Sequence, residues 1–530
     1  MTQYVDATAV KKMITDGAEL ALLDVREDGQ FGEGHMLLAV PMPYSHLEAR
    51  LATQLPRRST RTMLVDDGDG VAERAAARMD ALGYTNVAVM SGGVPAWGAA
   101  GYVIFKGVNV PSKAFGEVVE HAAHTPSISA DELHAMFERG ENVVVVDGRT
   151  PEEFHRMNIP HGMSVPNAEL VYRIHDIAPA PETTVVVNCA GRTRSIIGAQ
   201  TLLNAAIPNK VVALRAGTMG WSLAGYTLER GSTPVIPEVS PGGLQKAKAT
   251  AARMADAYGI KRIDLATIHT WQQDTSRSLY LLDVRGQAEY AAGHLPGAIH
   301  APGGQLVQAT DAWVAARGAR IVLTDDTEVR AITTAHWLVQ MGWDVAVLRD
   351  GIGAAGAETG MPSRQVLGLQ EHPVDTMAPR ALADALQRGE AIAVDVDHSM
   401  DYRKRHLPGA LWAIRPRLSA LLPHLPVGKR VVLYSEHETR ARLAAIDWRT
   451  IYGSPVAVLA GGREAWVAQG LPVESSPSIP PDSACIDYLF FVHDRHQGNQ
   501  QAMRDYLSWE EALPGQIAAD GDATFNVRVP

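Results

Sequence analysis

The chain has 530 residues, of which 46% are hydrophobic, and its formal net charge at pH 7 is −11. That length predicts about three to five domains, each with a core of its own. The acidic excess is spread along the chain without a basic stripe, so we expect no nucleic-acid partner. The two cysteines, Cys189 and Cys485, are too few for a disulfide framework or a zinc cluster. Because neither a signal-peptide pattern nor an apolar run of about 18 residues occurs, we expect a cytoplasmic protein with no membrane partner.

One sequence pattern occurs four times along the chain. In each copy a short apolar run leads into an acidic turn: ALLDVRE at 21–27, VVVVDGR at 143–149, YLLDVRG at 280–286 and AIAVDVD at 391–397. A second apolar run follows, then an Ala-rich stretch with helical spacing, then a third apolar run and a glycine turn. Apolar runs that alternate with helical patterns predict βα units and a mainly parallel sheet covered by helices on both faces.

A polar residue stands eleven positions after the first aspartate of each copy, namely His35, Asn158, His294 or His406. Three histidines at one position of a pattern suggest metal ligands, but each belongs to a different copy. We therefore expect hydrogen-bonded turn residues and no metal site.

Each copy spans about 110 to 135 residues, which is the size of a domain rather than of a solenoid repeat. We predict four domains and a C-terminal extension, at 1–105, 106–236, 237–365, 366–475 and 476–530. Pro, Gly and Ser accumulate in four predicted linkers, near 106–126, 232–262, 361–378 and 474–482. We also expect a connecting helix over 113–124 and an amphipathic helix around 499–512.

The motifs of these copies resemble the rhodanese domain. The resemblance is most specific in DVRGQAEYAAGHLPGAIHAP of the third copy and in NCAGRTRSIIGAQ of the second. Four copies in one chain resemble the bacterial multi-domain rhodanese-related sulfurtransferases. The resemblance implies four tandem doubly wound α/β domains, with the active cysteine at the end of a central strand and directly before a helix. It also implies a thiosulfate sulfurtransferase-like enzyme.

Only the second copy has a thiol where this resemblance requires one. Alignment of the second apolar runs places Cys189 opposite Asp67, Asp325 and Ser435 of the other copies. A carboxylate or a hydroxyl cannot hold a sulfane sulfur as a persulfide. We therefore predict that the first, third and fourth domains are catalytically inactive.

The residues after Cys189 form the predicted substrate-binding loop: Ala190, Gly191, Arg192, Thr193, Arg194 and Ser195. Between a strand and a helix, we expect the backbone N–H groups of this loop to point inward and the helix dipole to favour negative charge. Both effects, together with the two arginines, would lower the pKa of the thiol and attract an anion. Asp147 and Arg149 are predicted to form an ion pair that supports the loop.

The length of this loop separates two kinds of chemistry. A cysteine-dependent phosphatase or arsenate reductase needs C-x5-R around a tetrahedral oxyanion, whereas Arg194 makes this motif C-x4-R. The shorter loop favours a single sulfur atom. The open alternative is that Cys189 is a buried structural thiol in a binding domain.

The predicted reaction is a double displacement without a metal or cofactor. Cys189 would take sulfur from a small anionic donor, thiosulfate or a small persulfide, and pass it to a thiol, cyanide or protein acceptor. The alternative function is a multi-domain scaffold that docks partner proteins and delivers or binds sulfur. Cys485 is either an inert buried residue or a relay that receives the sulfur, and the oligomeric state is left open.

Overall fold

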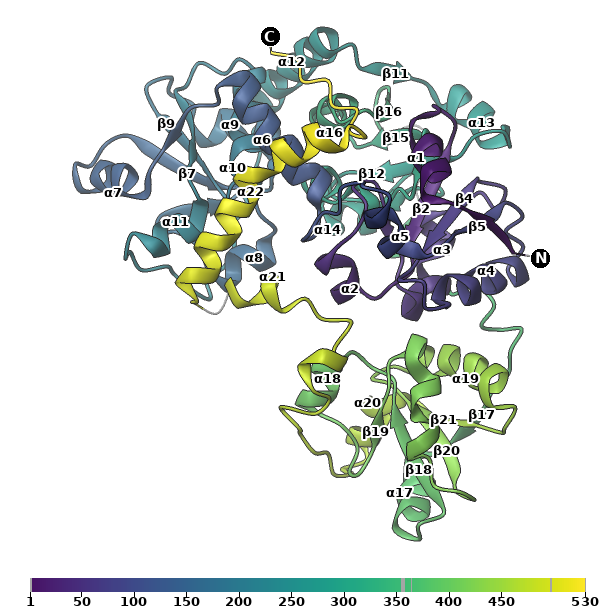
Figure 1. Cartoon of the computed structure of the whole chain (residues 1–530). Coiled ribbons are helices and arrows are strands. Elements are labelled where there is room, and N and C mark those ends of the chain that lie inside the picture. The colour runs from purple at the N-terminus through teal and green to yellow at the C-terminus, as the bar shows by residue number, and fades with distance from the viewer. Residues whose placement is uncertain (1, 354–357, 364, 496–497, 530) are drawn as a thin grey trace. The chain divides into compact units, whose positions relative to one another are not determined.

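The computed structural model describes residues 2–353, 358–363, 365–495 and 498–529 (Figure 1). It divides into two compact units. Unit 1 comprises Met1–Val10, Leu22–Gly107 and Arg364–Phe490, and unit 2 comprises Lys11–Ala21, Val108–Ser363 and Phe491–Pro530. Each predicted domain range contains the strands of one mainly parallel sheet, but β14 (Ala316–Arg317) of the third range pairs antiparallel with β2 (Leu20–Asp24) and so extends the first sheet. The domain boundaries themselves stay predictions.

The second domain shows the topology that all four sheets share. Its strands lie in the order β6-β10-β9-β7-β8, and every neighbouring pair is parallel. The strands are β6 (Ser127–Ile128), β7 (Val143–Asp147), β8 (Gly162–Ser164), β9 (Thr184–Asn188) and β10 (Val211–Leu214). The helices are α6 (Val110–Ala123), α7 (Ala130–Glu138), α8 (Pro151–Arg156), α9 (Leu170–Ile177), α10 (Thr193–Asn204) and α11 (Gly217–Leu223).

The third domain repeats this order as β11-β16-β15-β12-β13. Its strands are β11 (Lys261–Ile263), β12 (Leu279–Asp283), β13 (Ile299–His300), β14 (Ala316–Arg317), β15 (Arg320–Thr324) and β16 (Asp344–Leu348). Its helices are α12 (Pro241–Tyr258), α13 (Leu265–Gln273), α14 (Gln287–Ala292), α15 (Gly303–Gln308) and α16 (Val329–Gln340).

The first domain has the order β1-β5-β4-β2, with β3 paired to β2. Its elements are β1 (Gln3–Val5), α1 (Ala7–Thr15), β2 (Leu20–Asp24), α2 (Asp28–Glu33), β3 (Val40–Pro41), α3 (Leu47–Gln54), β4 (Thr62–Val65), α4 (Val71–Ala81), β5 (Val87–Met90) and α5 (Gly93–Ala99).

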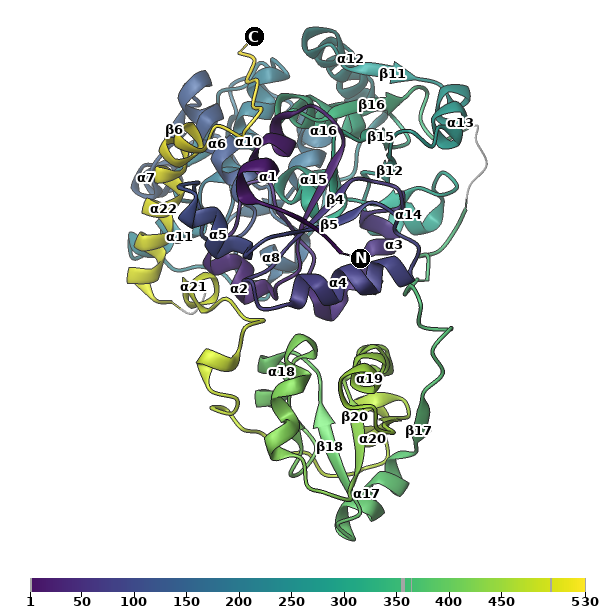
Figure 2. The same ribbon diagram turned by 45° about the vertical axis from the view of Figure 1, so that its right-hand side comes forward.

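The fourth domain has the order β17-β21-β20-β18-β19 (Figure 1), and Figure 2 shows its neighbouring strands β18 and β20 from another side. Its elements are β17 (Asp375–Met377), α17 (Pro379–Gln387), β18 (Ala391–Asp395), α18 (Ser399–Lys404), β19 (Leu411–Trp412), β20 (Arg430–Tyr434), α19 (Glu438–Tyr452), β21 (Ala457–Leu459) and α20 (Gly462–Ala468). The extension adds α21 (Phe490–Asp494) and α22 (Gln500–Asp520).

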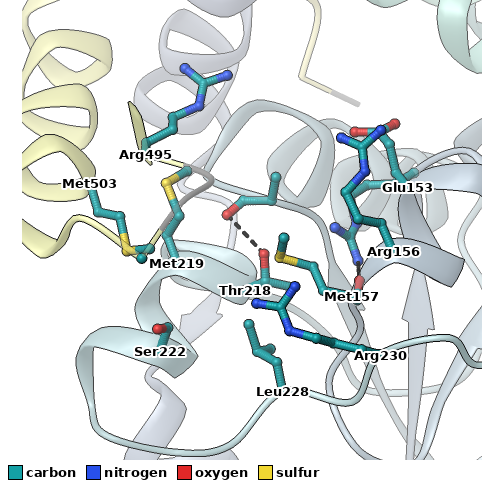
Figure 3. A pocket seen from close by; sticks show the side chains of 13 residues that line it. Glu153, Arg156, Met157, Thr218, Met219, Ser222, Leu228, Arg230, Arg495 and Met503 are labelled. Atoms are coloured by element: carbon teal, nitrogen blue, oxygen red, sulfur yellow. Dashed lines mark hydrogen bonds between the residues drawn. The ribbon is translucent and has the colours of Figure 1, made fainter. Parts of the chain in front are cut away.

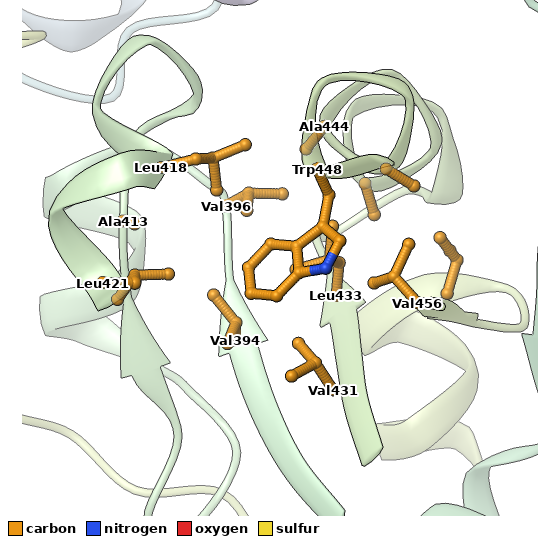
Figure 4. Close-up of a cluster of buried hydrophobic side chains, with 13 residues drawn as sticks. Val394, Val396, Ala413, Leu418, Leu421, Val431, Leu433, Ala444, Trp448 and Val456 are labelled. Carbon is orange, nitrogen blue, oxygen red and sulfur yellow. The ribbon is translucent and has the colours of Figure 1, made fainter. Parts of the chain in front are cut away.

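Side chains of the fourth sheet enter two separate cores, because successive residues of a strand point to opposite faces. Val394 packs in one core with Trp448 of α19 (Figure 4), whereas Ala393 packs in the other with Trp466 of α20. Both faces are therefore covered by helices. This confirms the predicted doubly wound arrangement and explains why the strands read as continuous apolar runs.

The polar residues eleven positions after each first aspartate are hydrogen-bonded, as predicted, but they lie in isolated bridges rather than in turns. Each of them forms an isolated antiparallel bridge with a residue near the end of its own domain, namely His35 with Phe105, Asn158 with Glu229, His294 with Glu358 and His406 with Glu474. His294 also stacks on the ring of Tyr290, with ring centroids 3.8 Å apart. These side chains are fixed by local contacts.

The segment predicted as a linker over 232–262 is only partly one, and this prediction was wrong for its second half. Ser240 caps α12 by accepting a hydrogen bond from the Gly243 N–H, and Gly259 ends the helix in the left-handed region. The flanking Pro and Gly residues are thus the start and stop signals of a helix. The helices expected over 113–124 and around 499–512 are confirmed as α6 and α22, the latter continuing to Asp520.

Within the described ranges, none of the helices is both long enough and apolar enough to cross a lipid bilayer.

Candidate active site

Cys189 lies in unit 2 at the carboxyl end of β9, four residues before α10 begins. The valine-rich run of β9 forms a buried central strand, and its end brings the cysteine to the edge of the sheet where ligands of parallel α/β folds bind. The side chain of Cys189 is buried, at 2% exposed.

Backbone hydrogen bonds from α11 hold the start of the loop. Thr218 N donates to Cys189 O at 2.9 Å, and Met219 N donates to Ala190 O at 3.1 Å. Gly217 has φ of +51°, and a β-carbon there would lie 2.2 Å from Cys189 O. A glycine is therefore required beside the cysteine for two reasons, its backbone conformation and the close approach of the carbonyl.

Burial raises the pKa of the Cys189 thiol, whereas Arg194 and a hydrogen bond with Ser195 act to lower it. Cys189 Sγ donates to Ser195 Oγ over 3.5 Å, and Ser195 Oγ in turn donates to Arg192 O at 2.8 Å. The predicted lowering of the thiol pKa is therefore wrong for this arrangement. The loop does supply stabilising groups, but removal of the sulfur from water outweighs them.

The predicted ion pair between Asp147 and Arg149 is confirmed. Arg149 Nε donates to Asp147 Oδ1 at 2.9 Å, and its Nη2 donates to Oδ2 at 2.7 Å. Asn188, the last residue of β9, also donates to Asp147 Oδ2 at 2.7 Å. The pair thus ties β7 to the residue that precedes Cys189.

Both arginines of the loop are bound by carboxylates. Arg194 donates two hydrogen bonds to Glu153 of α8, at 2.6 and 2.7 Å. Although burial acts to raise the pKa of Glu153, the hydrogen bonds and charge of Arg194 lower it to about 2. The sequence presented these arginines as positive charges available to an anion, whereas the structure pairs each of them with an acidic side chain.

Arg192 is held from two helices outside the sheet. It contacts Glu117 at 2.7 Å and also Glu120, both on α6, and it contacts Glu511 of α22 at 3.0 Å. Figure 1 shows α22 running along α6, and the two helices pack against each other. The second half of the loop is therefore enclosed by the connecting helix and the C-terminal extension.

A small cavity of about 70 Å³ opens beside the loop at Ala190 (Figure 3). Among the described residues, four arginines and one glutamate line it, namely Arg149, Arg156, Arg230, Arg495 and Glu153. Methionines 157, 219 and 503 form much of its apolar wall. A pocket with this lining is suited to a small anion that carries a soft, polarisable atom.

Sequence reasoning missed the acidic partners of the loop. Glu153 could have been found, since it stands six residues after Asp147 just as Glu289 stands six residues after Asp283 of the third copy. Glu289 likewise binds Arg330, the arginine of the third loop, at 2.8 Å. No local signal marks Glu117 or Glu511, because helices remote in the sequence bring them to the loop.

The residue that replaces Cys189 in the first domain is Asp66 and not Asp67, so the predicted alignment was wrong by one position. Val94 N donates to Asp66 O at 2.8 Å, which is the counterpart of the bond from Thr218 N to Cys189 O. The same bond marks Asp325 and Ser435, which accept from Ile352 and Arg463. Two consecutive aspartates follow β4, and only the backbone register distinguishes them.

Cys485 belongs to unit 1, whereas Cys189 belongs to unit 2. Both cysteines are free thiols and both are buried. Cys485 Sγ donates to Pro481 O at 3.4 Å. A sulfur relay between the two cysteines stays a prediction. Over the described part of the chain, no group of three or more potential ligand residues could hold a metal ion.

The rhodanese-like domain family model matches the chain four times, at residues 6–100, 129–224, 266–357 and 378–469. The chain therefore belongs to the rhodanese-like domain family, as the sequence motifs predicted.

Solved structures extend this relationship to the whole chain. The crystal structure of thiosulfate sulfurtransferase from Pseudomonas aeruginosa is 44% identical, covers 99% of both chains and has a TM-score of 0.94. The Alr3790 protein from Anabaena sp. is 27% identical over 20% of this chain and 93% of its own, but its TM-score of 0.19 gives that match no weight. No curated protein sequence matches this chain.

Proposed function

We propose that this chain moves a sulfane sulfur from a small anionic donor to a thiophilic acceptor through a persulfide on Cys189. The observation that carries the proposal is the position of this one thiol, on a loop between a central strand and a helix in a chain of the rhodanese family. The full-length likeness to a thiosulfate sulfurtransferase supports sulfurtransferase activity. Thiosulfate or a small persulfide is the proposed donor.

In the first step, Cys189 Sγ attacks the outer sulfur of thiosulfate as a thiolate. The S–S bond of thiosulfate breaks, and sulfite leaves with the bonding electron pair. In the second step, an acceptor such as cyanide attacks the outer sulfur of the persulfide, and the bond between the two sulfurs breaks. Thiocyanate leaves and the Cys189 thiolate is regenerated, so the cycle needs no redox partner.

The lining of the cavity supports an anionic donor. Of its arginines, Arg156 and Arg230 are exposed, and neither forms an ion pair with any residue that the structure describes. Arg194, by contrast, is already neutralised by Glu153 and lies close enough to Cys189 to interact with it electrostatically. We propose that Arg156 and Arg230 attract the donor, while Arg194 stabilises the charge on sulfur.

The decisive experiment compares Cys189→Ser with Cys485→Ser in the full-length chain. Each variant is incubated with thiosulfate, and intact-protein mass spectrometry detects the addition of one sulfur atom. Turnover to thiocyanate is measured in parallel. We expect Cys189→Ser to lose both sulfur loading and turnover, because a hydroxyl cannot form the persulfide.

Cys485→Ser is the matched control, since it removes the second buried thiol of the chain. It should load sulfur and turn over at the rate of the unaltered chain. Persisting turnover in Cys189→Ser would refute the proposal. Normal loading with failed sulfur release in Cys485→Ser would instead identify Cys485 as a relay.

A further inference from the structure

The C-terminal extension places a carboxyl group against the loop that carries Cys189. Glu510 of α22 accepts a hydrogen bond from Tyr506 Oη at 2.8 Å and one from Thr193 Oγ1 at 3.5 Å, both through Oε1. Its other oxygen, Oε2, lies 3.2 Å from the position that a β-carbon on Gly191 would occupy. The carboxyl therefore contacts two residues of the proposed substrate-binding loop.

Glu510 is one of the most deeply buried carboxyl groups in unit 2, at 2% exposed. Its Oε2 is fully buried and has no hydrogen-bond partner among the residues that the structure describes. A buried carboxylate oxygen without a donor is costly, because the charged form has lost its water. Such a group is stable only if a nearby cation compensates for the lost water or if it binds a proton.

The charged and titratable groups that interact with Glu510 include Lys113 and Glu117 on α6 and Arg495 and Tyr506 of the extension. Beyond them, Arg194 of the loop interacts with Lys113 and Tyr506, and Arg192 binds Glu117 and Glu511. Lys113 Nζ lies over the rings of Tyr506 and Trp509, at 5.1 and 4.8 Å from their centroids. It donates to Val108 O at 2.7 Å. Within the described residues, Lys113 and Glu510 form neither a hydrogen bond nor an ion pair with each other.

Nearby cations compensate only partly for the water that the Glu510 carboxylate has lost. Burial raises the pKa of Glu510, and Lys113 opposes that rise. Burial lowers the pKa of Lys113 to about 7, and Glu510 opposes that fall. The negative charge of Glu510 also raises the pKa of the Cys189 thiol. Two buried groups of the same charge in one site do not both ionise readily.

We propose that Glu510 is a positioning residue for Cys189. While Cys189 is a thiol, Glu510 carries the negative charge of the site. When Cys189 becomes a thiolate or persulfide anion, Glu510 takes up a proton. One proton leaves Sγ and one is gained at the Glu510 carboxylate, so the net charge of the enclosed site stays constant. This role rests on the proposed function of Cys189. It assigns the C-terminal extension to the control of charge at the active loop.

The experiment measures the pH dependence of Cys189 alkylation by iodoacetamide, which reports the thiolate directly and requires no sulfur transfer. Alkylation of each cysteine is followed by mass spectrometry in the full-length chain. In Glu510→Gln the side chain keeps its shape and its hydrogen bond from Tyr506, but it loses the charge. We expect the midpoint of Cys189 alkylation to fall to a pH about one unit lower.

Two further variants separate charge from structure. Asp505→Asn removes a carboxylate from the exposed face of the same helix and should leave the midpoint unchanged. Tyr506→Phe removes a hydrogen bond from Glu510 but not its charge, so it should move the midpoint less than Glu510→Gln does. A purely structural role predicts equal shifts in Glu510→Gln and Tyr506→Phe.

An unchanged or higher midpoint in Glu510→Gln would overturn the proposal. The persulfide assignment is tested separately, because it depends on sulfur loading of Cys189, whereas the alkylation midpoint does not. A second readout is the pH profile of kcat/KM with thiosulfate. It should contain two coupled ionisations in the unaltered chain and one in Glu510→Gln.

Discussion

The loop after β9 and the loop after β15 occupy the same place in the two adjacent domains of unit 2, but their first residues interact differently with the loop. In the third domain, Asp325 accepts hydrogen bonds from the backbone N–H groups of Thr327, Glu328, Arg330 and Ala331, at 3.1, 2.5, 2.9 and 3.3 Å. In the second domain, the side chain at this position is the Cys189 thiol, which bonds to Ser195. The aspartate thus accepts several backbone hydrogen bonds within its own loop, whereas the thiol is bound by a serine side chain.

What the two loops share is equally informative. Arg194 binds Glu153, and Arg330 at the equivalent position binds Glu289. Because the pair occurs both in the domain that we propose to be active and in a domain predicted to be inactive, it belongs to the fold of the loop and not to sulfur chemistry alone. The chemical difference between the two loops therefore lies in their first residue, Cys189 or Asp325, and in the charged residues that follow it.

The largest expected effect concerns the two shared arginines. Arg330 is fully buried and contacts three carboxylates, those of Glu169, Glu289 and Asp326, whereas Arg194 is 11% exposed and contacts Glu153. Arg330→Met should therefore lower the free energy of unfolding by about 3 to 5 kcal/mol, because it removes a fully buried cation that binds three carboxylates, of which Glu169 is itself buried. Arg194→Met should cost about 1 to 2 kcal/mol. Hydrogen exchange resolved by segment measures both, and equal losses would contradict the comparison.

The second prediction moves the thiol from one loop to the other. In a chain with Cys189→Ser and Asp325→Cys, the loop of the third domain would carry the cysteine. Asp326 and Glu328 stand where the second domain has Ala190 and Arg192. We expect thiosulfate to load this thiol about 100-fold more slowly than Cys189, since the local charge repels an anionic donor.

Neutral iodoacetamide provides the control for that exchange, because repulsion of an anion does not affect it. If the transplanted thiol reacts with iodoacetamide but not with thiosulfate, charge is what separates the loops. If thiosulfate loads the transplanted thiol as fast as it loads Cys189, then the lack of a cysteine is by itself the reason for the predicted inactivity of the third domain.

The smallest expected change is spectroscopic and tests the two loops at different pH. Burial raises the pKa of Asp325 to about 6, with Arg330 opposing the rise. The contribution of Asp325 to folding stability is thus fully present below its unfolded pKa of 3.8 and is lost as the pH rises through about 6. The contribution of Glu153 has the opposite sign. It is present above 4.5 and is lost as the pH falls through about 2.

Infrared spectra recorded between pH 7 and pH 5 should contain a buried carboxylic-acid band with a midpoint near 6, apart from the band of Glu27, whose pKa burial raises to about 7. The band should be missing in Asp325→Asn and retained in Glu153→Gln. If the band were instead missing in Glu153→Gln and retained in Asp325→Asn, the raised pKa would belong to Glu153 and the assignment to the two loops would be reversed.

The sequence was sufficient to predict the four domains, their parallel sheets and the position of Cys189. These features depend on local patterns, because a buried parallel strand needs a continuous apolar run and the loop follows directly from its end. The alignment of the first domain failed where the pattern was degenerate. Asp66 and Asp67 have the same chemistry, and only the hydrogen bond from Val94 N fixes which one replaces the cysteine.

The environment of the thiol could not be predicted from the sequence. Its pKa depends on how completely α6, α11 and α22 remove the loop from water, and this burial is a property of tertiary packing. Glu510 and Lys113 are remote from Cys189 in the sequence, and neither lies in a motif of the repeat. Their proximity is therefore visible only in the folded chain.

The enclosure of the loop by α22 also has a consequence for protein synthesis. Glu510 is added to the growing chain 319 residues after Gly191, a delay of roughly 15 to 60 seconds at about 5 to 20 residues per second. Because domains generally fold in the order in which they are made, the second domain completes its sheet long before α22 exists. Every newly made molecule thus passes through a stage in which the loop of Cys189 is folded but not yet covered, and translation of α22 ends that stage.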